Sequence, residues 1–162
     1  MSVRTKVVGA SERLDADALR IVGAGLAFLV AIVHLYWGMP RLIAYLNVGT
    51  MPDPRPPLFV LSGVAILIGV TIVAAGGDRR PVYVAGMALM LAYLLGYGAW
   101  HTVLGHGAFW PWGPGGHVHG GNPIVVIAEH LVADPLALVS KLAELALLAI
   151  LIVLYRLESR TA

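Results

Sequence analysis

Four long apolar stretches alternate with short segments rich in charge, glycine or proline. They cover about residues 21–38, 58–75, 81–100 and 136–156. A helix needs about 20 predominantly apolar residues to cross the hydrocarbon core of a bilayer, and each stretch has close to that length. The pattern predicts an all-α integral membrane protein, built as a four-helix bundle with short loops.

The segments between these stretches predict where the helices end. We expect the first span to end at the break around Pro40, after which residues 41–49 continue as a kinked or interfacial turn. The proline-rich run at 51–59 is expected to be a stiff connector, because proline interrupts helices and sheets alike. The short loop at 76–80 makes the second and third spans an antiparallel hairpin.

The last apolar region is too long for a single crossing. A continuous helix over 124–157 would measure about 50 Å at 1.5 Å per residue, against a hydrocarbon core of about 30 Å. We therefore expect an extra interfacial helix at 124–133, a break before Pro135, and a spanning helix over 136–156. Residues 101–123 then form a loop rich in histidine, glycine and tryptophan.

The composition indicates that lipid is the main partner of the chain. Of 162 residues, 59% are hydrophobic and only 12% are charged, whereas soluble domains carry about 25% charged residues. The length predicts one membrane domain over residues 1–162. The first twenty residues lack the apolar core of a secretory signal, so the first span is expected to stay uncleaved. The net charge of +2 gives no indication of nucleic-acid binding.

Several chemistries are excluded by missing residues. The chain has no cysteine, which removes disulfides, thiolate metal sites and covalent c-type haem attachment. The sequence also lacks the glycine-rich phosphate loop, the His-Glu-x-x-His motif, the Gly-x-Ser-x-Gly elbow and the dinucleotide fingerprint. Nucleotide-driven pumping is therefore not encoded, and an enzymatic activity is the less favoured hypothesis.

The distribution of basic residues predicts the orientation in the membrane. Eight of them lie in the N-terminal segment, the second loop and the C-terminal tail, and two lie in the other loops. Because cytoplasmic segments carry an excess of Lys and Arg, we expect a cell-membrane protein with both termini in the cytoplasm. All four tryptophans then lie at the outer interface, where such rings accumulate. The eight basic residues are Arg4, Lys6, Arg13, Arg20, Arg79, Arg80, Arg156 and Arg160, and the other two are Arg41 and Arg55.

Five of the six histidines lie between residues 101 and 130, in a stretch without Lys or Arg. We expect four imidazoles near the same outer leaflet, namely His34, His101, His106 and His130. Of these, His34, His101 and His130 are expected to share one cavity. Converging imidazole nitrogens suit zinc, copper, nickel or iron. The alternative is that each buried histidine simply bonds to a tyrosine or a backbone carbonyl.

The other two histidines of this stretch form a separate case. His117 and His119 flank one residue in a glycine-rich part of the loop. Such a pair can chelate Cu(II) or Ni(II). We expect adventitious metal binding there rather than a selected site.

Other polar groups are placed to assist the four imidazoles. Glu129 or Asp134 can add a carboxylate ligand or hold an imidazole tautomer from outside the coordination sphere. Tyr93 and Tyr97 lead up to His101 at intervals of four residues, along one face of the third span. The sequence therefore predicts a cluster of histidines and carboxylates at the outer face.

Two charged residues lie well inside the last span. Lys141 and Glu144 are three residues apart, so they can neutralise each other on one helical face. An unpaired ionisable group at this depth costs about 2.5 to 3.5 kcal/mol. If Pro135 only kinks the helix, His130 and Asp134 extend the pair into a polar stripe. The pair is expected to act as internal glue, with snorkelling of Lys141, a proton or ion relay, and a contact to a partner subunit as alternatives.

The layout of four short-looped spans resembles the small bundles that include DoxX-like proteins and di-haem four-helix cytochromes. It departs from the di-haem cytochromes because it lacks paired histidines on each of two helices. The resemblance is architectural, so it implies a fold and transfers no residue roles.

Three functions remain open. The leading hypothesis is that the outer cluster handles a metal ion or protons, in a small transporter or a redox-associated membrane subunit. The second is a non-catalytic accessory subunit, which packs into a homo-oligomer or a larger membrane complex. The third is an electron carrier with a single haem b, held by two imidazoles such as His34 with His101 or His130. The expected cofactor is accordingly a transition-metal ion or haem b.

Overall fold

The computed structural model describes residues 3–113, 116 and 120–161, and all regular structure within these ranges is helical. Four of its five helices are long and apolar enough to span a membrane. The predicted all-α architecture with four spans and one additional helix is confirmed. The helices are α1 (Val3–Val48), α2 (Arg55–Ala74), α3 (Arg79–His101), α4 (Pro123–Ala133) and α5 (Pro135–Thr161).

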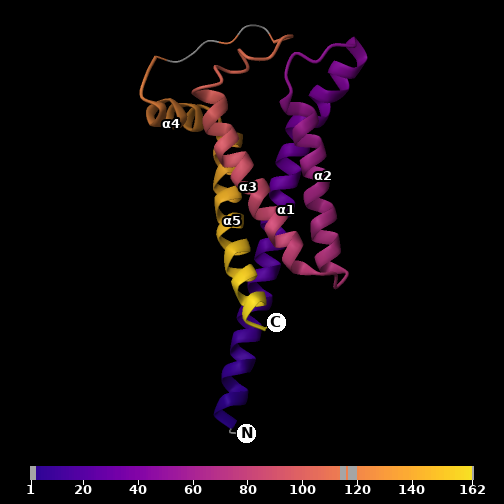
Figure 1. Ribbon diagram of the computed structural model, residues 1–162, viewed down its shortest axis with the longest axis vertical. Coiled ribbons are helices and arrows are strands. Elements are labelled where there is room, and N and C mark those ends of the chain that lie inside the picture. The colour runs from indigo at the N-terminus through magenta and orange to yellow at the C-terminus, as the bar shows by residue number, and fades with distance from the viewer. Residues whose placement is uncertain (1–2, 114–115, 117–119, 162) are drawn as a thin grey trace.

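The four long helices form an elongated bundle (Figure 1). α1 packs against α2 and α5, and α3 packs against α5, whereas α2 and α3 make fewer contacts with each other. The start of α1, the end of α5 and the α2–α3 turn lie at one end of the bundle, which we call the terminal end. The α1–α2 connection, α4 and the segment after α3 lie at the opposite end, which we call the histidine end.

α1 continues through Pro40, so the expectation that the first helix ends there is wrong. A proline inside a helix removes one backbone hydrogen bond and crowds the preceding turn. Next to it, the Nη1 atom of Arg41 donates to the Trp37 carbonyl over 2.7 Å. Gly38 allows α2 to support this part of α1, since a Cβ there would lie 3.0 Å from the carbonyl oxygen of Pro56.

α2 begins at Arg55, three residues earlier than predicted. Its prolines lie in the first turn, where the backbone N–H groups have no partner inside the helix and proline is tolerated. Asp53 fixes this start, because its carboxylate accepts from the Arg55 backbone N–H over 2.9 Å and pairs with the guanidinium over 2.6 Å.

The predicted break before the last span is confirmed, and the capping contacts explain it. The Asp134 carboxylate accepts from the backbone N–H groups of Leu136 and Ala137, over 3.0 and 3.1 Å. Asn122 caps α4 in the same way, accepting from Ile124 over 2.9 Å. α4 consequently lies across the long axis of α5 instead of extending it (Figure 1).

The core is apolar at its centre and ionic at the terminal end. Val30, Met90 and Leu147 are buried where α1, α3 and α5 meet. At the terminal end, Glu158 of α5 accepts hydrogen bonds from two arginines, Arg20 of α1 over 2.9 Å and Arg79 of α3 over 3.2 Å. Apolar side chains also cover the outside of the spans, as expected for helices whose solvent is lipid.

Candidate metal centre

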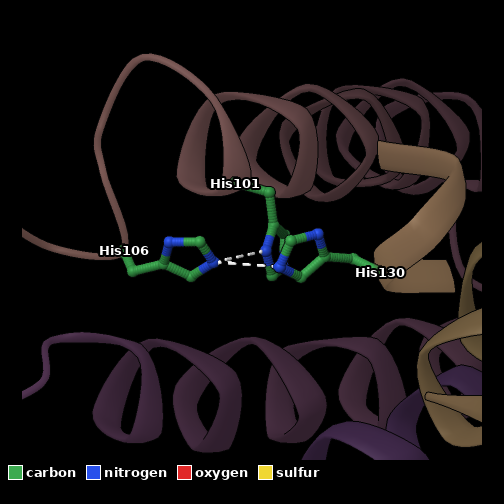
Figure 2. Close-up of side chains that lie close together, drawn as sticks. All are labelled: His101, His106 and His130. Atoms are coloured by element: carbon green, nitrogen blue, oxygen red, sulfur yellow. Dashed lines mark hydrogen bonds between the residues drawn. The ribbon is translucent and has the colours of Figure 1, made fainter. Parts of the chain in front are cut away.

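Three imidazoles converge at the histidine end. His101 is the last residue of α3, His106 lies in the following segment, and His130 lies on α4 (Figure 2). The Nε2 atom of His106 is 2.9 Å from Nδ1 of His101 and 3.3 Å from Nε2 of His130. One ligand atom from each residue lies within 4.8 Å of the other two, and all three side chains are half-buried. We call this group the histidine trio.

An unusual backbone places His106 in the histidine trio. Gly105, His106 and Gly107 all have positive φ angles, of 49°, 56° and 93°. This region is uncommon for a residue with a side chain and costs free energy, so it persists only where the surroundings impose it. Two contacts impose it here. The His106 N–H donates to the Trp100 carbonyl over 2.9 Å, and a Cβ on Gly107 would lie 2.8 Å from the Trp100 ring.

The orientation of the His130 ring follows from its backbone contact. Its Nδ1 lies 2.8 Å from the carbonyl oxygen of Val126, one turn earlier on α4. A carbonyl oxygen only accepts, so Nδ1 carries the proton and donates. The neutral ring then directs the lone pair of Nε2 toward His106. A backbone carbonyl that fixes the tautomer in this way is typical of metal-binding histidines.

Two of the three nitrogen spacings in the histidine trio, those to Nε2 of His106, fit a transition-metal ion. At metal–nitrogen distances of about 2.0–2.1 Å, two ligating nitrogens are about 2.9 Å apart at a right angle and about 3.4 Å apart at a tetrahedral angle. The observed 2.9 and 3.3 Å lie within these limits. Three imidazoles also leave at least one coordination position open for water or a further ligand.

The predicted carboxylates do not join the histidine trio. Glu129 and Asp134 are exposed, and within the described ranges the trio contains no acidic residue. Asp134 is used as the cap of α5, and the helix break next to it separates His130 from the last span, so the continuous polar stripe is not formed. His117 and His119 lie outside the described residues.

His34 shares a cavity with His101 and His130 without belonging to the histidine trio. The cavity has a volume of about 620 Å³ and lies among α1, α2, α3, α4 and α5. The His34 ring is stacked on Tyr93 with centroids 4.0 Å apart, and its edge contact with Phe59 has a centroid distance of 4.7 Å. Its Nδ1 lies 2.8 Å from the Val30 carbonyl oxygen. Aromatic packing therefore keeps this imidazole inside the bundle.

A polar network lies on the inner side of the same cavity. Lys141 Nζ is 2.7 and 2.6 Å from the two carboxylate oxygens of Glu144, so the structure contains the ion pair that the sequence indicated. Ser140 donates to Glu144 over 2.8 Å, and Tyr93 donates to Ser62. Sequence reasoning missed both serines, although Ser140 lies one helical turn before Glu144.

Two rings continue the polar wall from this network toward the histidine trio. Lys141 Nζ lies 5.2 Å from the centre of the Tyr97 ring, a distance that favours a cation–π contact. The Tyr97 ring in turn contacts His101, with centroids 4.4 Å apart. Polar and aromatic groups thus follow one another from Glu144 to the histidine trio.

The segment after α3 is tied to the α1–α2 connection. Trp110 Nε1 donates to the Met51 carbonyl over 2.7 Å. The Arg55 guanidinium lies 4.0 Å from the centre of the Trp100 ring and 5.0 Å from that of Trp37. The Trp110 contact thus ties the segment after α3 to the α1–α2 connection, and the Arg55 contacts join α2 to α3 and α1.

Comparison with known proteins gives no further assignment. No protein-family model, no curated protein and no solved structure matches this chain.

Proposed function

We propose that this membrane protein binds a divalent transition-metal ion at the histidine end, with His101, His106 and His130 as ligands. The observation that carries the proposal is the convergence of three imidazole nitrogens from three separate parts of the chain, at 2.9 and 3.3 Å from the central one. Imidazole nitrogens suit zinc, copper, nickel and iron, whereas magnesium and calcium prefer oxygen ligands.

Metal binding accounts for this arrangement better than proton storage does. Three positively charged imidazoles at these distances would repel one another. A metal ion requires the neutral rings and contacts all three at once. The positive φ of His106 is a further reason, since strained residues persist mainly where a site depends on them.

We also propose that the histidine end faces the outside of the cell and that both termini are cytoplasmic. The basic residues favour this orientation, because eight of them flank the terminal end. Ile124 and Val132 of α4 are 77% and 79% exposed, which suits a helix that lies in the membrane interface. In this orientation the histidine trio captures its ion from the external side, as in a small metal transporter or a metal-binding subunit.

The haem alternative is less favoured. An axial imidazole must direct one nitrogen to the iron, in a gap wide enough for a porphyrin. His34 instead lies between Tyr93 and Phe59, and its two nitrogens face the Val30 carbonyl and the Glu144 carboxylate.

Titration of the purified, metal-free protein with Co(II) tests the proposal. Bound cobalt gives visible absorbance, and we expect tight binding of one equivalent of Co(II) by the unmodified protein, the parent. His106→Ala and His130→Ala should weaken it by more than the roughly 10- to 100-fold that follows the loss of an outer partner of a ligand. A protein in which His117 and His119 are both alanine is the matched control and should bind like the parent. If tight Co(II) binding is lost when His117 and His119 are replaced but is retained in His106→Ala and His130→Ala, the proposal is refuted.

A further inference from the structure

The buried carboxylate of Glu144 has a second nitrogen facing it. Glu144 is 0% exposed, and its Oε1 lies 3.7 Å from Nε2 of His34. The other His34 nitrogen, Nδ1, faces the Val30 carbonyl oxygen and must donate to it. In the neutral ring, Nε2 therefore carries a lone pair. Two acceptor atoms, one from α1 and one from α5, face each other across a gap that suits a cation.

Lys141 provides the positive charge in the structure. Its Nζ is surrounded by three oxygens, the two carboxylate oxygens of Glu144 and the Tyr93 carbonyl oxygen at 3.4 Å. The Lys141 side chain is 15% exposed, whereas the Glu144 side chain is fully buried. Lys141 also lines the cavity, and its four-carbon stem is flexible. The Lys141 ammonium can therefore move away from the carboxylate, whereas the buried Glu144 carboxylate is held in place.

We propose that Glu144 and His34 form a second position for a divalent transition-metal ion, and that Lys141 competes with the ion for this position. Metal–nitrogen and metal–oxygen distances of about 2.1 Å place the two ligand atoms 3.7 Å apart at an angle of about 120° at the metal. The second carboxylate oxygen and the Tyr93 carbonyl supply further ligands of suitable type. The tethered ammonium holds the carboxylate neutralised whenever no ion is bound.

The second position extends the proposed function, because the cavity connects it to the histidine trio. His101 and His130 line the same cavity as His34 and Lys141. The cavity therefore reaches from two members of the histidine trio to His34 and to the Lys141 side chain that pairs with Glu144. The second position itself depends only on His34 and Glu144, so its binding can be measured separately from that of the trio.

The main test uses a protein in which His101, His106 and His130 are all alanine, so that binding to the histidine trio is absent. In this background, Lys141→Met removes the competing ammonium and leaves the stem nearly intact. We expect Co(II) to bind at least tenfold more tightly than with Lys141 present, and to raise the melting temperature. The double change Lys141→Met and Glu144→Gln is the matched control and should lose both effects. Equal Co(II) binding in both proteins would overturn the second position.

A second measurement does not depend on the folding of Lys141→Met. His34→Gln keeps the ion pair between Lys141 and Glu144 and leaves the histidine trio unchanged. Titrated with Co(II), the parent is expected to bind a tight and a weaker equivalent, and His34→Gln only the tight one. Retention of both equivalents in His34→Gln would overturn the second position. If the unmodified protein binds only the weaker equivalent, metal binding by the histidine trio is refuted and the second position remains.

Discussion

Removing either member of the Lys141–Glu144 pair should destabilise the protein to different degrees. Glu144 is completely buried, so Lys141→Leu leaves an unpaired carboxylate inside the bundle. Removing one partner of a buried pair costs about 3–5 kcal/mol, and insertion of a lone ionisable group costs about 2.5–3.5 kcal/mol. We therefore expect a loss of about 3 kcal/mol or more for Lys141→Leu. Glu144→Leu should cost less, because the partly exposed ammonium can move into the cavity.

The double variant, with leucine at both positions, should recover most of the stability. Replacing a whole buried pair by apolar residues is often neutral or stabilising. We expect a coupling energy of at least about 2 kcal/mol, measured by reversible unfolding in mixed micelles with metal-free buffer. Leu142→Ala with Leu145→Ala is the control pair, since both side chains are exposed on the same helix at the same spacing and should give additive effects. A coupling near zero for the ion pair would refute the reasoning.

Three further predictions concern the rest of the fold. Glu158→Gln should destabilise by about 1 kcal/mol in unfolding experiments because it weakens bonds to two arginines, and Asp17→Asn, which weakens a single exposed pair, should cost less. Gly107→Ala should weaken Co(II) binding in titrations, because its Cβ would meet the Trp100 ring, whereas Gly120→Ala has open space and should not. Reporter fusions at Gly77 and at the C-terminus should register as cytoplasmic and one at Gly120 as external; an external signal at Gly77 would reverse the proposed orientation.

The helices could be predicted from the sequence because length and hydrophobicity decide which segments cross a bilayer. The expectation of a helix end at Pro40 was wrong, because α2 packs against this part of α1 and supports the helix there. The close approach of α2 at Gly38 depends on tertiary packing, which no local sequence pattern indicates. The break at Pro135 was predictable because Asp134 is a strong capping residue immediately before a proline.

All three members of the histidine trio are among the four imidazoles that the sequence places near one leaflet, and His34 is the fourth. His101 and His130 lie at helix ends near the same side of the bundle, which the order of the spans indicates. The contribution of His106 depends on three successive positive φ angles, and neighbouring glycines are only a weak signal for them. The place of His34 depends on which face of α1 meets Tyr93 and Phe59, and hydrophobic periodicity does not determine that rotation.

Because α4 is lightly packed, an ion bound by the histidine trio would help to hold this helix in place. α4 makes few contacts with α3 and α5 compared with those among the long helices, and it is joined to α5 directly at Asp134. A bound ion would crosslink His106 and His130, which are 24 residues apart in the chain, and would close the intervening segment into a ring. Such a crosslink lowers the conformational entropy of the chain when α4 is detached, so that reattachment costs less. The concentration of the metal ion at the histidine end would then set how firmly the mouth of the cavity is held together.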